Sequence, residues 1–114
     1  MNALLTAFPA DLALVHGVVT RITVGTTKAG AEYARVSVRK PGAQTRSFPV
    51  WDGLADIVRE EDAVRSLSIF GTGVAVGASV TLFVSIESVS TKNADGTSGY
   101  AEYKLGSVQG AEVR

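Results

Sequence analysis

The clearest pattern along the chain is a regular alternation of apolar and polar side chains. In residues 31–40, AEYARVSVRK, three aliphatic side chains alternate with polar and aromatic ones: Ala34, Val36 and Val38 against Tyr33, Arg35, Ser37 and Arg39. Successive side chains of a strand point to opposite faces. The segment is therefore predicted to be a strand with one aliphatic face in the core and one aromatic, cationic face outside it.

Four further strands are predicted. An alternating stripe of Val80, Leu82, Val84 and Ile86 indicates a long, half-buried strand over residues 78–90. Residues 14–24 and 99–108 are rich in β-branched and aromatic residues, with a bulge or tight bend expected at Gly17 and a hairpin loop at residues 93–96. Residues 45–51 contain Pro49, which lacks an N–H donor, so this strand is expected at a sheet edge or a bulge.

The apolar period changes between the third and fourth of these strands. Leu54, Ile57, Val58 and Val64 recur at roughly helical spacing with acidic residues between them, and Asp52 can cap a helix. One short helix is predicted here. Five strands with a helix between strands three and four is the order of the OB-fold, a small all-β Greek-key barrel. Other small barrels and α+β sheets fit this order less well.

A chain of 114 residues is sufficient for one domain with its own core. We expect an N-terminal extension at 1–12, an OB-fold domain at 13–110 and a C-terminal end at 111–114 without an acidic tail. The start of the chain lacks the basic segment of a signal peptide, and no apolar run approaches the roughly 20 residues that span a bilayer. The sequence thus predicts a cytoplasmic protein with no membrane partner.

The composition gives little support to an enzyme. The chain has no cysteine and a single histidine, His16, which argues against disulfides, a cysteine nucleophile and a histidine or cysteine metal site. No catalytic triad can be assembled, and no glycine-rich phosphate loop leads from a strand into a helix. We therefore expect no catalytic activity, no cofactor, no metal and no small-molecule substrate.

The charges cancel overall but are unevenly placed. Eleven basic and eleven acidic residues give zero net charge. Residues 16–46 nevertheless contain six Lys and Arg residues against one Glu, whereas residues 52–62 are mainly acidic. This separation predicts a local positive surface, although two ordinary solvated surfaces would have the same pattern.

In order and spacing, these segments resemble the single-stranded DNA-binding proteins of bacteria and phages that have the OB-fold. The resemblance covers about His16 to Val108 and rests on HGVVTRI, TTKAG, YARVSV, FPVWDGLADIV, VGASVTLFVSI, NADG and GYAEYKL. It implies a homodimer or homotetramer that binds single-stranded DNA with little sequence preference in DNA replication, recombination or repair. Position by position, Trp51 matches a base-stacking aromatic. Thr45 and Thr91 stand where cellular members often have further aromatic residues, which implies weaker or differently arranged binding.

A non-specific binder of single strands combines a basic groove with aromatic faces. The candidate binding residues are accordingly aromatic, cationic or on the exposed face of residues 31–40: Tyr33, Arg35, Ser37, Arg39, Trp51, Arg21, Lys28, Arg46 and Lys92. Lys104 is a further candidate for a phosphate contact. Phe83 is out of phase with the buried stripe, which predicts either stacking on bases or a place at a subunit interface, with the interface favoured. The alternative function is an OB-fold interaction module, such as a primosome-type accessory or assembly protein, with weak or no nucleic-acid binding.

Overall fold

The computed structural model describes residues 12–92 and 98–114, with the backbone alone described for residues 88–92 and 98–103. These residues form eight strands and no helix. The strands are β1 (Leu12–Thr26), β2 (Glu32–Arg39), β3 (Arg46–Val50), β4 (Leu54–Glu60), β5 (Ala63–Ile69), β6 (Thr72–Ala75), β7 (Ser79–Lys92) and β8 (Ser98–Val113). The all-β class and the five predicted strands are confirmed.

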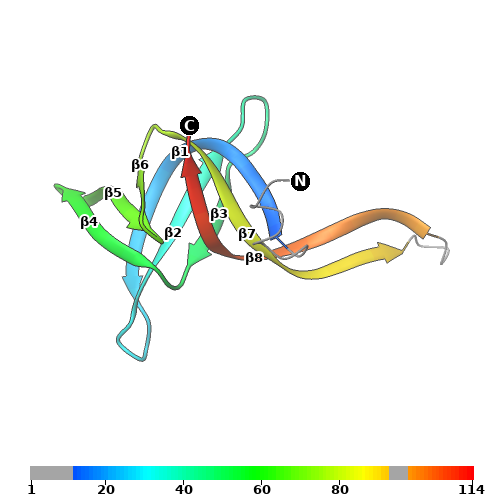
Figure 1. Ribbon diagram of the computed structural model, residues 1–114, viewed down its shortest axis with the longest axis horizontal. Helices are drawn as coiled ribbons and strands as arrows, with labels where there is room; N and C mark the ends of the chain where they lie inside the picture. Colours follow the sequence, from blue (N-terminus) through cyan, green and yellow to red (C-terminus); the bar gives the residue numbers. More distant parts are fainter. Residues whose placement is uncertain (1–11, 93–97) are drawn as a thin grey trace.

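The strands form two antiparallel sheets (Figure 1). The larger has the order β3-β2-β1-β7-β8 and the smaller the order β4-β5-β6. The strand β1 is long enough to pair with β7 along its first half and with β2 along its second half. The hairpin of β7 and β8 extends beyond the body of the molecule as a long arm (Figure 1). The strands β3 and β8 contact each other, but no hydrogen-bonded ladder joins them in the described part of the chain.

The predicted helix is wrong: residues 54–75 form the three-stranded sheet instead. Register shifts interrupt the pairing of β4 with β5 between Ala55 and Val58 and again between Val58 and Arg59. Asp56 has a φ of 50° at the first shift. A bulge adds one residue to a strand, so side chains three apart can point to the same face. Leu54 and Ile57 both pack against the core for this reason, and their spacing imitates a helix.

The core lies between the two sheets and follows the predicted alternation. Val36 and Leu82 of the larger sheet and Leu67 and Val74 of the smaller one belong to a single buried cluster. Ala34 and Val38 are also buried, while Arg35 and Arg39 are exposed. The aliphatic face of residues 31–40 is therefore confirmed as core, which fixes the opposite face of β2 as surface.

Several predicted details are settled by the strand pairing. β3, which contains Pro49, is an edge strand, as predicted. The irregularity in β1 lies between Val19 and Arg21 rather than at Gly17, where a Cβ would be 3.1 Å from the Arg39 carbonyl. Gly17 therefore permits a close approach of two backbones. β1 begins at Leu12 and β8 continues to Val113, while residues 1–11 of the predicted N-terminal extension lie outside the described part. No helix among the described residues is long and apolar enough to cross a membrane.

Candidate nucleic-acid interface

The outer face of β1, β2 and β3 brings together most of the predicted binding residues. In the register, Arg35 lies between Thr23 of β1 and Pro49 of β3. Ser37 lies between Arg21 and Ser47 in the same way. Residues paired across neighbouring strands point to the same face of a sheet. Tyr33, Arg35, Ser37, Arg39 and Arg21 therefore share one surface, opposite to the core.

Two aromatic rings meet at one end of this surface. The ring centroids of Tyr33 and Trp51 are 5.2 Å apart, with their planes tilted by 40°. Trp51 follows the last residue of β3 and is 50% exposed, as its position after the buried Val50 predicts. A Cβ at Gly25 of β1 would lie 2.8 Å from the Tyr33 hydroxyl oxygen, so the tyrosine ring extends over that glycine. The pair thus spans three strands while the tryptophan remains open to solvent.

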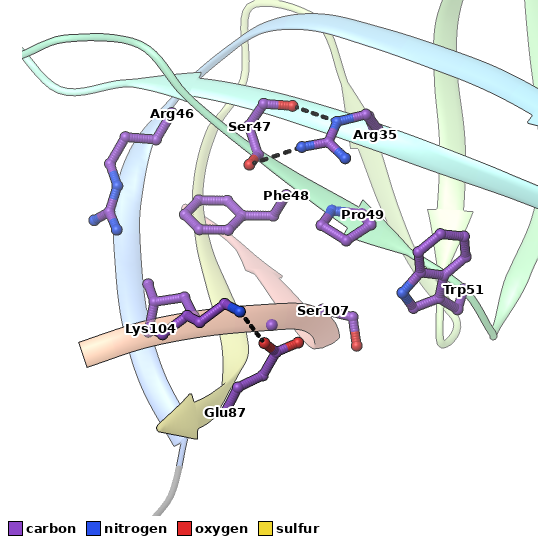
Figure 2. Close-up of a pocket in the computed structure, with 11 residues that line it drawn as sticks. Arg35, Arg46, Ser47, Phe48, Pro49, Trp51, Glu87, Lys104 and Ser107 are labelled. Carbon is purple, nitrogen blue, oxygen red and sulfur yellow. Dashed lines mark hydrogen bonds and ion pairs between the residues drawn. The ribbon is translucent and has the colours of Figure 1, made fainter. Parts of the chain in front are cut away.

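The Arg35 guanidinium, on the same face of the sheet as the rings, is held by Ser47 of β3. Its Nε–H donates to Ser47 Oγ at 3.0 Å and its Nη2 donates to the Ser47 carbonyl oxygen at 3.4 Å (Figure 2). A guanidinium has five N–H donors, so these two bonds leave donors for an anion. The group is exposed. Arg35 is therefore a positioned cation on the surface rather than a freely moving one.

A groove of about 570 Å³ runs between β3 and β8 next to these residues (Figure 2). Trp51 and Arg35 line it from the outer face of the sheet, Arg46 lines it from the opposite face of β3, where it pairs with Val38, and Lys104 lines it from β8. The Arg46 guanidinium carbon lies 5.2 Å from the centroid of the Phe48 ring, a cation–π geometry that holds this cation at the groove. Three cations and an open indole ring therefore face one hollow.

One acidic side chain enters the same groove. Lys104 Nζ lies 3.6 Å from Glu87 Oε2, at the base of the β7–β8 arm (Figure 2). Gly106 provides the room, because a Cβ there would lie 3.0 Å from Glu87 Cγ. The carboxylate neutralises part of the positive charge, so the groove keeps a net positive charge from Arg35 and Arg46.

The other predicted residues do not line the groove. Arg39 is exposed on β2 outside the groove, and Lys28 is exposed in the turn between β1 and β2. Arg21 lines a separate hollow of about 380 Å³ near β5, together with Arg59. Lys92 is the last residue of β7, and its side chain lies outside the described part.

Phe83 is placed on the predicted face but is not exposed. It pairs with Leu14 of β1 and Gly110 of β8, on the face opposite to Leu82 and Val84. Its ring is only 6% exposed, whereas Leu14 beside it is 56% exposed. The interface role of Phe83 stays a prediction, and Leu14 offers the larger apolar surface at this position.

The acidic segment after Trp51 forms no metal centre in the described residues. Its five carboxylates are all exposed, on the β3–β4 connection, β4 and the following turn: Asp52, Asp56, Glu60, Glu61 and Asp62. No group of three or more His, Cys, Asp or Glu that could hold a metal ion occurs in the part that the structure describes.

Comparisons with protein-family models, with curated proteins and with solved structures gave no match. The resemblance to single-stranded DNA-binding proteins therefore remains an interpretation of the sequence.

Sequence reasoning missed three residues of this site. Ser47 was predictable, since the alternation that buries Phe48 and Val50 places residues 47, 49 and 51 on the outer face. Gly25 and Glu87 left no such signal. The role of each depends on a neighbour from another strand, Tyr33 for Gly25 and Lys104 for Glu87.

Proposed function

We propose that the protein binds single-stranded DNA with little sequence preference, on the outer face of β1, β2 and β3 and in the adjoining groove. The proposal includes the OB-fold family suggested by the sequence and a role in DNA replication, recombination or repair. The observation that supports it most is the open Tyr33–Trp51 pair on the same sheet face as the fixed guanidinium of Arg35. Rings that stack on bases and cations that neutralise phosphates are the two requirements of such binding.

A single strand fits this surface better than a duplex. Stacking on a protein ring requires a base face that is not already covered by its neighbours, which a single strand can supply. Non-specific binding to a duplex depends mainly on neutralising many phosphates. A chain of zero net charge with three groove cations is poorly suited to that task.

The deciding experiment is a competition assay at low salt. Labelled oligo(dT) is mixed with the protein, and unlabelled duplex of equal length is added as competitor. We expect a complex with oligo(dT) that the duplex displaces poorly. Absence of a complex would remove this function and leave the alternative, an OB-fold interaction module.

Glu87 is expected to limit affinity, because its carboxylate competes with a phosphate for Lys104. The substitution Glu87→Gln should strengthen oligo(dT) binding by up to about fivefold, the equivalent of a surface ion pair of about 1 kcal/mol. Fluorescence anisotropy of labelled oligo(dT) measures the change. Glu60→Gln is the matched control, since Glu60 pairs with Arg65 on the smaller sheet. Equal effects of both substitutions would show that overall charge, and not this contact, is responsible.

We further propose that the protein is a cytoplasmic, non-enzymatic homodimer or homotetramer. Support for self-association comes from an exposed Leu14 beside a hollow lined by Leu12, Ile86 and Leu105. Covering apolar surface of this kind stabilises association. Sedimentation velocity at micromolar concentration is expected to show two or four subunits, and a single monomer species would contradict it.

A further inference from the structure

An exposed aromatic ring occupies a strained turn close to Trp51. Ile69 of β5 pairs directly with Thr72 of β6, so Phe70 and Gly71 form a two-residue hairpin loop. Both have positive φ, 47° for Phe70 and 84° for Gly71. A loop of this type favours Asn-Gly, because asparagine and glycine adopt such angles most readily. Phenylalanine is a poor choice for the backbone at this position.

The surroundings of Phe70 do not bury it. The residue is 48% exposed, and it is not among the side chains of the core cluster. One ring edge lies over Gly53, where a Cβ would be 2.6 Å from Phe70 Cδ1. The Phe70 N–H donates to the Gly53 carbonyl oxygen at 2.8 Å, which ties the loop to the connection between β3 and β4. The contact fixes the ring while leaving about half of it open.

This connection also contains Trp51. Gly53 is two residues from Trp51, and two residues span at most about 7 Å along the chain. Two exposed aromatic residues are thus linked through Gly53: Trp51 lies two residues before it on the β3–β4 connection, and Phe70 of the smaller sheet is hydrogen-bonded to it. Residues held in strained backbone conformations cluster at active sites and ligand-binding sites.

We propose that Phe70 is a further base-stacking residue, which extends the aromatic surface of Tyr33 and Trp51 onto the smaller sheet. The inference rests on the proposed function. The phenyl ring offers a nucleobase a face without a hydrogen-bonding group. It therefore suits any base of a single strand. The strained conformation at residue 70 is accounted for by this use of the ring.

The test compares two substitutions of Phe70 in the full chain. Phe70→Asn removes the ring and supplies the residue that the turn prefers. Phe70→Leu keeps an apolar side chain over Gly53 but has no aromatic face. Val58→Ala is the matched control, because Val58 lies on the same sheet and is also 48% exposed. Affinity for labelled oligo(dT) is measured by anisotropy, and far-UV circular dichroism verifies the fold of each variant.

Both Phe70 variants are expected to bind oligo(dT) roughly 5- to 150-fold more weakly, the loss typical of one stacked base, with Val58→Ala unchanged. If Phe70→Leu binds like the wild type, the ring face is not used and the inference is overturned. That result leaves the proposed function standing, since the wild type still binds. If the wild type itself does not bind oligo(dT), the proposed function fails first. Should Phe70→Asn not fold, Phe70→Leu alone decides.

Discussion

Replacing Trp51 by alanine is expected to weaken oligo(dT) binding by about 1 to 3 kcal/mol, or roughly 5- to 150-fold. Trp51 is half exposed and lies against Tyr33, so a base can stack on its open face without rearrangement of the sheet. The substitution removes this face and also leaves the Tyr33 ring without its neighbour. The loss should therefore be among the largest for any single side chain of the site.

Fluorescence provides an independent readout, because Trp51 is the single tryptophan of the chain. Titration of the wild type with oligo(dT) should quench its emission if a base covers the indole. Trp51→Phe is the matched control, since it keeps a ring at the same position and should retain part of the affinity. Because the side chain is exposed, thermal stability is expected to change little. If the Trp51 emission of the wild type does not change at saturating oligo(dT), the indole ring is not in the binding site.

The strands that present the site could be predicted from the sequence because they alternate without interruption. In β2 every second residue is apolar and buried, so the period of two identifies both the core face and the exposed face. The same alternation on β3 predicts that Trp51 is exposed, because Phe48 and Val50 face the core and residue 51 therefore faces outward. These predictions needed only local information, and the structure confirms them.

The smaller sheet was mistaken for a helix because bulges alter that period. Asp56 adopts a left-handed conformation, and the register shifts near it place Leu54 and Ile57 on one side. A spacing of three is what a helix also produces. Phe70 was overlooked for the same reason, since a hairpin turn was not expected in this segment.

The groove itself depends on contacts between residues far apart in the sequence. It forms where β3 approaches β8, and the ion pair of Glu87 with Lys104 follows from the register of the β7–β8 hairpin. Neither contact leaves a local pattern in the sequence. The positions of the candidate cations relative to one another therefore required the structure.

Replacing Arg35 and Arg39 together by alanine is expected to weaken binding to all sequences alike and to reduce its salt dependence. Each lost phosphate contact should lower the slope of log affinity against log salt by about 0.7 for a single strand, so the double variant should lose up to about 1.4. Arg35 is positioned by Ser47 on the same face of β2 as Tyr33, and Arg39 extends this face along the strand. Affinity is measured at several salt concentrations with labelled oligo(dT).

The structure offers a control of equal charge. Arg59 and Arg65 are exposed on the smaller sheet and pair with Glu32 of β2 and Glu60 of β4, and their double replacement by alanine removes the same number of positive charges. If the positive charges on β2 attract the DNA, the slope of log affinity against log salt should fall for the Arg35 and Arg39 variant. The same slope should remain nearly constant for this control. Arg35→Lys with Arg39→Lys should retain most of the slope, because the charges stay in place. An equal fall in both alanine variants would mean that total charge governs binding, and the face of β2 would then not be the nucleic-acid site.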